Sequence, residues 1–303
     1  MSSRRTTNSM VASLLALLIG VAATAIPGAA AAAKPVPYGA NRAAGATFVH
    51  DGVTLYYETY GAGPPLLIIH GNGQSIGSMS GQIDHFKTRY RVIAMDSRDQ
   101  GKSGTSQGPI TYEKMADDLA ALLDHVKAEP ADVVGWSDGG IEALLLGIRH
   151  PGKVRKLVAM ASNLNPGPDA LEPELVALVK SMFPAGQVAE PATPEQKRAA
   201  KVGGIMLTEP NIDPALLAGI TAPTLILAAD HDMVRLEHMI AIYRALPNAN
   251  LAVFPDSSHA VSYDDPELFN ATVDRFLQTP FRNRDRIADV MGSLEKMNAE
   301  MAK

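Results

Sequence analysis

The 303-residue chain contains no cysteine, so it can form no disulfide and carry no lipid-modified cysteine. It also lacks an excess of charge: the formal net charge is -5, and no run of basic residues occurs. Nucleic acid is therefore not expected as a partner. With 46% apolar residues, the chain can bury one large core, or one core that carries an inserted lid.

The first 33 residues have the composition of a targeting segment. Arg4 and Arg5 precede an apolar run over residues 10–26, and a string of alanines follows. This pattern predicts a secretory signal peptide over residues 1–33, cleaved just before Lys34. Because the apolar run is short and interrupted, a retained membrane anchor is the less favoured interpretation. We expect a protein exported to the periplasm or the extracellular space, with no stable membrane insertion after cleavage.

Strand and helix patterns alternate after a Pro-, Gly- and Ala-rich stretch at residues 34–46, which we interpret as a linker or extended arm. Asp51-Gly52 between two short β-type runs predicts a hairpin. Continuous apolar runs predict buried strands at residues 65–71, 91–96, 133–134, 156–160, 224–228 and 251–254. Helically spaced apolar residues fall between them. The alternation over residues 47–278 predicts an α/β fold with a doubly wound, mostly parallel sheet.

The alternation stops at about residues 164–218, where only two helical patterns occur among many prolines. We predict that this insertion is a helical lid over the carboxyl ends of the strands, where such sheets bind ligands. Its apolar side chains are expected to face the site: Leu164, Leu171, Leu175, Leu178, Met182, Phe183 and Met206. Residues 279–303 carry an amphipathic pattern and are predicted to form a helical tail on the surface.

One stretch carries the chemistry: Gly135-Trp136-Ser137-Asp138-Gly139, between a predicted strand and a predicted helix. Glycines around a serine at such a turn allow a very sharp bend that pushes the hydroxyl outward. The following helix directs its free N–H groups toward that hydroxyl. Ser137 is therefore the candidate nucleophile.

A serine nucleophile needs a base and an acid that orients the base. His259 lies on the loop after the last predicted strand and is the candidate base. Two acids, Asp230 and Asp232, follow the preceding strand; we favour Asp232, which lies deeper in the loop. A metal cluster of Asp230, His231, Asp232 and His238 is the competing interpretation, but its spacing matches no known ligand pattern. We expect neither a metal nor another cofactor.

An acyl-transfer site also needs two N–H donors for the oxyanion. The N–H groups of Asp138 and Asn72 are the candidates, and His70 is expected to brace the loop that contains Asn72. The stretch Gly101-Lys102-Ser103 resembles the end of a phosphate-binding loop. That motif needs a glycine five residues before Gly101, where Asp96 stands, so nucleotide binding is rejected.

Together these motifs resemble the α/β-hydrolase superfamily over nearly all of residues 47–278, and the resemblance implies that fold and an acyl-cleaving activity. Asp99 stands where the family usually has glycine, but aspartate tolerates a left-handed backbone better than most residues. The stretch Gly135-Trp136-Ser137-Asp138-Gly139-Gly140 is similar to that of the valacyclovir-hydrolase (biphenyl hydrolase-like) branch. In that branch the aspartate after the nucleophile is implicated in binding the α-amino group of aminoacyl esters. We favour a simpler role for Asp138, in which it points away from the site and complements the helix N-terminus.

The sequence thus predicts an exported serine hydrolase of a carboxylic ester or related acyl bond, acting through Ser137, His259 and Asp232. Its expected partner is a small ester-type substrate. Alternatives are an aminoacyl-ester hydrolase that uses Asp138, a cofactor-free perhydrolase of the haloperoxidase-like type, and a carbon–carbon bond hydrolase. A non-catalytic receptor of the same fold is a fourth. The substrate and the oligomeric state stay open at this point.

Overall fold

A computed structural model of the chain describes residues 36–182, 192–282 and 286–301. The predicted signal peptide and its cleavage site lie outside these residues. In the described part no helix is long and apolar enough to cross a membrane.

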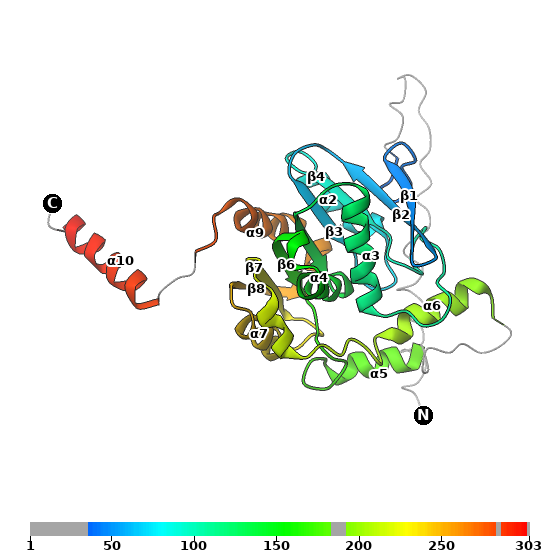
Figure 1. The fold of residues 1–303 in the computed structure, drawn as a ribbon. Coiled ribbons are helices and arrows are strands. Elements are labelled where there is room, and N and C mark those ends of the chain that lie inside the picture. The colour runs from blue at the N-terminus through cyan, green and yellow to red at the C-terminus, as the bar shows by residue number, and fades with distance from the viewer. Residues whose placement is uncertain (1–35, 183–191, 283–285, 302–303) are drawn as a thin grey trace, which may run out of the picture. The chain divides into compact units, whose positions relative to one another are not determined.

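The core is one eight-stranded sheet with the strand order β1-β2-β4-β3-β5-β6-β7-β8 (Figure 1). The pairs β1–β2 and β2–β4 are antiparallel, and every other neighbouring pair is parallel. This arrangement confirms the predicted fold class. The strands are β1 (Gly45–His50), β2 (Val53–Tyr60), β3 (Pro65–Ile69), β4 (Arg91–Met95), β5 (Ala131–Trp136), β6 (Val154–Met160), β7 (Thr224–His231) and β8 (Ala249–Ser258).

Helices cover both faces of the sheet, which explains why its central strands are apolar without alternation. In β3, Leu67 and Ile69 pack into the core on one face, and Leu66 and Ile68 pack into the core on the other. The helices on the first face are α3 (Tyr112–His125), α4 (Asp138–Arg149) and α7 (Leu236–Ala245). Those on the second face are α2 (Ser80–Phe86), α8 (Val261–Asp264) and α9 (Pro266–Gln278).

The irregular middle of the chain holds two further helices, α5 (Pro173–Met182) and α6 (Pro194–Ile205), which contact each other (Figure 1). Helix α5 begins at Pro173, shortly after Leu171 pairs with Val234 in an isolated β-bridge. Helix α6 begins with a capping box between Thr193 and Gln196. These contacts define where α5 and α6 begin.

Two short helical segments after β3 could not be predicted from the periodicity of apolar residues. The segment after β3 forms a 3₁₀ turn over Ile76–Met79 and then α2, neither of which is long enough to show an apolar period. Near the C-terminus, α10 (Arg286–Met301) matches the helical pattern of the tail, and its described side chains are exposed.

The N-terminal arm is held to the domain by a buried carboxylate. Glu58 in β2 is fully buried and accepts the backbone N–H groups of Gly39 and Asn41 at 2.7 and 2.9 Å. It also accepts the hydroxyls of Tyr56 and Tyr60. The described part of the predicted linker is therefore anchored to the sheet, because a buried carboxylate needs donors that this arm supplies.

Candidate active site

The serine predicted as nucleophile lies at the sharp turn between β5 and α4. Ser137 has φ +57° and ψ -122°, a strained conformation for a residue with a side chain. The turn leaves no room for side chains at the flanking glycines: a Cβ on Gly135 would lie 2.0 Å from the carbonyl oxygen of Gly139. A Cβ on Gly139 would lie 2.4 Å from the carbonyl oxygen of Ile69. The glycines thus permit the turn that exposes the hydroxyl.

Three side chains that are far apart in sequence form a hydrogen-bonded chain at the carboxyl ends of β5, β7 and β8. The Ser137 hydroxyl lies 2.9 Å from Nε2 of His259, and Nδ1 of His259 lies 2.7 Å from Oδ1 of Asp232. The side chain of Asp232 is 1% exposed, and its Oδ1 also accepts the Val234 N–H at 3.0 Å. This arrangement allows His259 to take a proton from Ser137 while Asp232 fixes the ring orientation.

The second candidate acid has a different position. Asp230 accepts the backbone N–H groups of Asp256 and Ser257, at 2.9 and 3.0 Å, and so ties the end of β7 to the end of β8. These hydrogen bonds hold the pKa of Asp230 below its usual range. Of the two acids, the structure brings Asp232 and not Asp230 to His259.

The competing metal cluster is not assembled in the structure. His238 lies away from the two acids, with its Nε2 accepting the Leu164 N–H at 3.0 Å. Among the described residues, no three His, Asp or Glu side chains are placed to hold a metal ion.

The two residues that carry the candidate oxyanion donors contact each other through their side chains. Asp138 is the first residue of α4, so its N–H has no acceptor within the helix. In the described ranges, neither this N–H nor that of Asn72 donates to another protein group. The side-chain amide of Asn72 donates to Oδ2 of Asp138 at 2.8 Å and to the Val202 carbonyl of α6 at 2.9 Å. The amide thereby fixes the Asn72 loop between α4 and α6.

Asp138 is buried and is one of the residues that line the cavity. Its partners are the Asn72 amide and the Tyr112 hydroxyl, which are side chains rather than the N–H groups of α4. Burial raises the pKa of Asp138 to about 6, against the opposing effect of these hydrogen bonds and of His259. Asp138 thus belongs to the residues that line the cavity, and its place in the first turn of α4 also lets its charge complement the helix N-terminus. A donor 66 residues away in sequence, rather than the helix end, sets the direction of its side chain.

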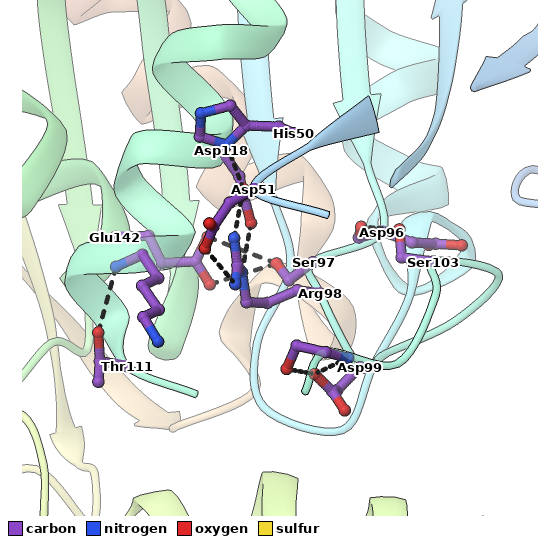
Figure 2. A network of polar contacts seen from close by, with 12 residues as sticks. His50, Asp51, Asp96, Ser97, Arg98, Asp99, Ser103, Thr111, Asp118 and Glu142 are labelled. Atoms are coloured by element: carbon purple, nitrogen blue, oxygen red, sulfur yellow. Dashed lines mark hydrogen bonds and ion pairs between the residues drawn. The ribbon is translucent and has the colours of Figure 1, made fainter. Parts of the chain in front are cut away.

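The loop after β4 is hydrogen-bonded to the segment that contains Asn72. Buried His70 donates from Nδ1 to the Gly71 carbonyl at 2.8 Å and accepts the Ser97 N–H at Nε2, 3.0 Å away. Burial lowers the pKa of His70, which favours the neutral ring that this pattern requires. The Ser97 hydroxyl in turn donates to Glu142 of α4 at 3.2 Å, as Figure 2 shows.

The loop after β4 is itself clamped by a buried ion pair. Arg98 binds both oxygens of Asp118 in α3, at 2.6 and 2.7 Å, and His50 binds the same carboxylate at 2.7 Å (Figure 2). The side chains of Arg98 and Asp118 are 2% and 0% exposed. A buried, bidentate pair of this kind gives the loop a single geometry.

Asp99, which replaces the usual glycine, adopts the left-handed backbone with φ +62°. Its buried carboxylate accepts a hydrogen bond from the Ser106 hydroxyl. Its Oδ1 also forms an ion pair with Nζ of Lys201 in α6, at 3.0 Å. Lys201 also donates to the Ser106 carbonyl, at 3.0 Å. The departure at Asp99 thus gives α6 an ionic attachment to the sheet.

Ser137 and His259 open into a narrow cavity of about 60 Å³. Its apolar wall includes six residues from the middle segment: Leu171, Leu175, Val176, Val179, Met206 and Leu207. Three of the residues expected here therefore line the cavity.

The expectation is wrong for three other residues of that set. Leu178 and Met182 are each 48% exposed, and Leu164 is buried in the main core. On α5 the cavity is lined by Leu175, Val176 and Val179, and Leu178 lies outside this face. Phe183 lies outside the described residues. Helix orientation, and not composition, selects the lining.

Three polar lining residues were not singled out from the sequence: Tyr112, Asn163 and Glu209. Glu209 accepts the Tyr112 N–H at 3.1 Å, and burial raises the pKa of its carboxyl group. No motif marks these positions, because each reaches the cavity only through the packing of α3 and the middle segment.

Comparison with known proteins agrees with this fold. Residues 64–185 match a family model described as the alpha/beta hydrolase fold. A protein of Azorhizobium caulinodans named "Putative carbamate hydrolase RutD" is 30% identical over an alignment 251 residues long, which covers 74% of this chain and 95% of the relative. The chain therefore belongs to the α/β-hydrolase family, and it is a hydrolase of that fold.

More distant relatives agree with this assignment. The mouse protein named Serine hydrolase BPHL is 26% identical over 268 residues, covering 81% of this chain and 90% of that protein. A solved structure of a hydrolase from Pseudomonas aeruginosa PA01 matches with a TM-score of 0.65 and 26% identity, over 79% of this chain and 100% of that one. Both similarities extend over most of the described domain.

Proposed function

We propose that the protein is a serine hydrolase that cleaves small carboxylic esters through an acyl-enzyme intermediate. The observation that carries the proposal is the chain of hydrogen bonds from Ser137 through His259 to Asp232, at 2.9 and 2.7 Å, which opens into an apolar cavity. The N–H groups of Asn72 and Asp138, which have no protein acceptor in the described residues, would bind the oxyanion.

The reaction follows from these positions. His259 Nε2 takes the hydroxyl proton of Ser137 as the oxygen attacks the ester carbonyl, and Asp232 stabilises the imidazolium. The N–H groups of Asn72 and Asp138 bind the oxyanion of the tetrahedral intermediate. His259 then returns the proton to the leaving alcohol. Water, activated by the same histidine, hydrolyses the acyl-serine and releases the acid.

The cavity suggests the substrate class. Its lining from the middle segment is aliphatic or sulfur-containing, and its volume is about 60 Å³. Such a wall favours an uncharged, moderately hydrophobic acyl group, and the small volume of the cavity favours a short one.

We propose that α5 and α6 act as the lid over this cavity. Export through the signal peptide of residues 1–33 belongs to the same proposal, and the purified exported protein should begin at Lys34.

A fluorophosphonate probe and an ester panel test the proposal directly. The probe should label Ser137 of the wild-type protein and fail to label Ser137→Ala. p-Nitrophenyl esters should be cleaved fastest with short acyl chains, and a p-nitrophenyl carbamate in the same panel examines the activity in the name of the Azorhizobium relative. A wild-type protein that is neither labelled nor active on any member of the panel would instead be a receptor of this fold.

An aminoacyl-ester hydrolase is the second candidate, favoured by the charge of the cavity wall. Among its described lining residues are two acids, Asp138 and Glu209, and no lysine or arginine. An α-ammonium group next to Asp138 would form a charge-assisted hydrogen bond worth about 1.5–3 kcal/mol, or about ten- to more than a hundredfold in kcat/KM. The comparison is kcat/KM for an amino-acid ester and its des-amino analogue. A preference above tenfold that disappears in Asp138→Asn would select this candidate.

A further inference from the structure

The residue before the serine makes a contact that the proposed mechanism does not yet use. The indole Nε1 of Trp136 donates a hydrogen bond to the backbone carbonyl of His259 at 2.8 Å, although 123 residues separate the two. The two rings lie 5.8 Å apart between centroids, at an interplanar angle of 47°. Trp136 is the last residue of β5 and the only tryptophan in the chain.

The other side of the indole is also fixed. A Cβ built on Gly71 would lie 3.4 Å from Cε3 of Trp136, so the ring packs against the backbone of the loop that carries Asn72. The indole is thus held between the candidate oxyanion loop and the histidine loop. The indole therefore has little freedom to move relative to either loop.

Two neighbouring residues therefore hold His259 at two points. Ser137 contacts its ring through Oγ, and Trp136 contacts its main chain through Nε1. His259 lies just beyond the end of β8, where the sheet no longer supplies hydrogen bonds. Asp232 orients the ring of this residue but does not bond its backbone. Within the described chain, the indole is the group that ties the backbone of His259 to the strand carrying Ser137.

We propose that Trp136 is a positioning residue, whose N–H keeps His259 within reach of Ser137. This inference rests on the proposed serine-hydrolase function. Trp136 is absent from the described residues that line the cavity, so its loss should leave substrate binding nearly unchanged. Proton transfer depends on the distance between His259 and Ser137, so kcat should fall instead.

The single tryptophan allows a substitution at the level of one atom. Expression with β-(3-benzothienyl)alanine in place of tryptophan replaces the N–H of residue 136 by sulfur and retains a bicyclic ring. Expression with 4-fluorotryptophan retains the N–H and serves as the matched control. Both changes affect position 136 alone. Trp136→Phe, which also lacks the donor, is the second variant if the sulfur analogue does not fold.

The readouts are kcat, KM, the rate at which a fluorophosphonate labels Ser137, and the melting temperature. We expect the sulfur analogue to lower kcat and the labelling rate about three- to tenfold, the size of one neutral hydrogen bond, with KM changed less than twofold. The 4-fluorotryptophan protein should stay within twofold of the wild type in kcat, KM and the labelling rate. This rescue by a ring that keeps its N–H separates positioning from simple packing.

Two outcomes would overturn the inference: an unchanged kcat in the folded sulfur analogue or Trp136→Phe, or an equal loss in the 4-fluorotryptophan protein. Failure of the proposed function gives a different result. In that case the unsubstituted protein itself would show no labelling of Ser137 and no ester turnover.

Discussion

The stability of Asp138→Asn, measured relative to the wild type at the same pH, should increase from acidic to neutral pH. The side chain is buried, and the Asn72 amide that donates to its Oδ2 can still donate to an amide oxygen at that position. The substitution removes the ionisation and keeps the shape. The change in stability with pH therefore isolates the charge of Asp138.

The magnitude follows from the pKa. Burial raises the pKa of Asp138 from 3.8 to about 6 in the folded protein. At about 1.4 kcal/mol for each pH unit, this difference corresponds to about 3 kcal/mol. A raised pKa means that the folded state favours the proton. The stabilisation is complete below pH 3.8 and is lost as the pH rises to about 6 and beyond.

The assay is chemical and thermal denaturation of Asp138→Asn and of the wild type at pH 4, 5, 6, 7 and 8. Relative to the wild type, the variant should gain about 2.4 kcal/mol between pH 4 and pH 7, equivalent to about 5–10 °C in Tm. Asp230→Asn is the control with the opposite sign. The pKa of Asp230 is lowered by backbone donors, so this variant should be weakest at neutral pH and recover as the pH falls. An Asp138→Asn difference that does not vary with pH would refute the reasoning.

Three further predictions concern activity and the attachment of α6. Ser137→Ala should lower kcat by several orders of magnitude with nearly the same Tm; substantial turnover by the purified variant would contradict the mechanism. Asp232→Asn should lower kcat on the order of 10⁴-fold, and Asp230→Asn far less; steady-state kinetics showing the reverse order would make Asp230 the acid. Lys201→Met should lower stability by about 2 kcal/mol, because Asp99 would keep a buried charge without its cation. It should also raise KM, since α6 leads into the cavity wall, and an unchanged Tm and KM would show that this ion pair does not hold α6 in place.

The sequence alone was sufficient wherever the relevant interactions are local. The turn at Ser137 can be predicted because Gly135 and Gly139 are needed by the backbone within two residues of the serine. The hairpin at Asp51-Gly52 is equally local, and both of these residues have positive φ. The central strands could be recognised because burial on both faces requires a continuous apolar run. Such features depend on neighbours along the chain, which a sequence lists directly.

Tertiary structure decided which side chains meet. Asp230 and Asp232 are two residues apart and chemically identical, and only the packing of β7 against β8 directs one to a backbone and the other to His259. The direction of Asp138 depends on Asn72, and the attachment of α6 depends on Lys201 reaching a residue 102 positions earlier. No periodic pattern encodes these contacts. They arise because the parallel strands end at one edge of the sheet and bring their loops together there.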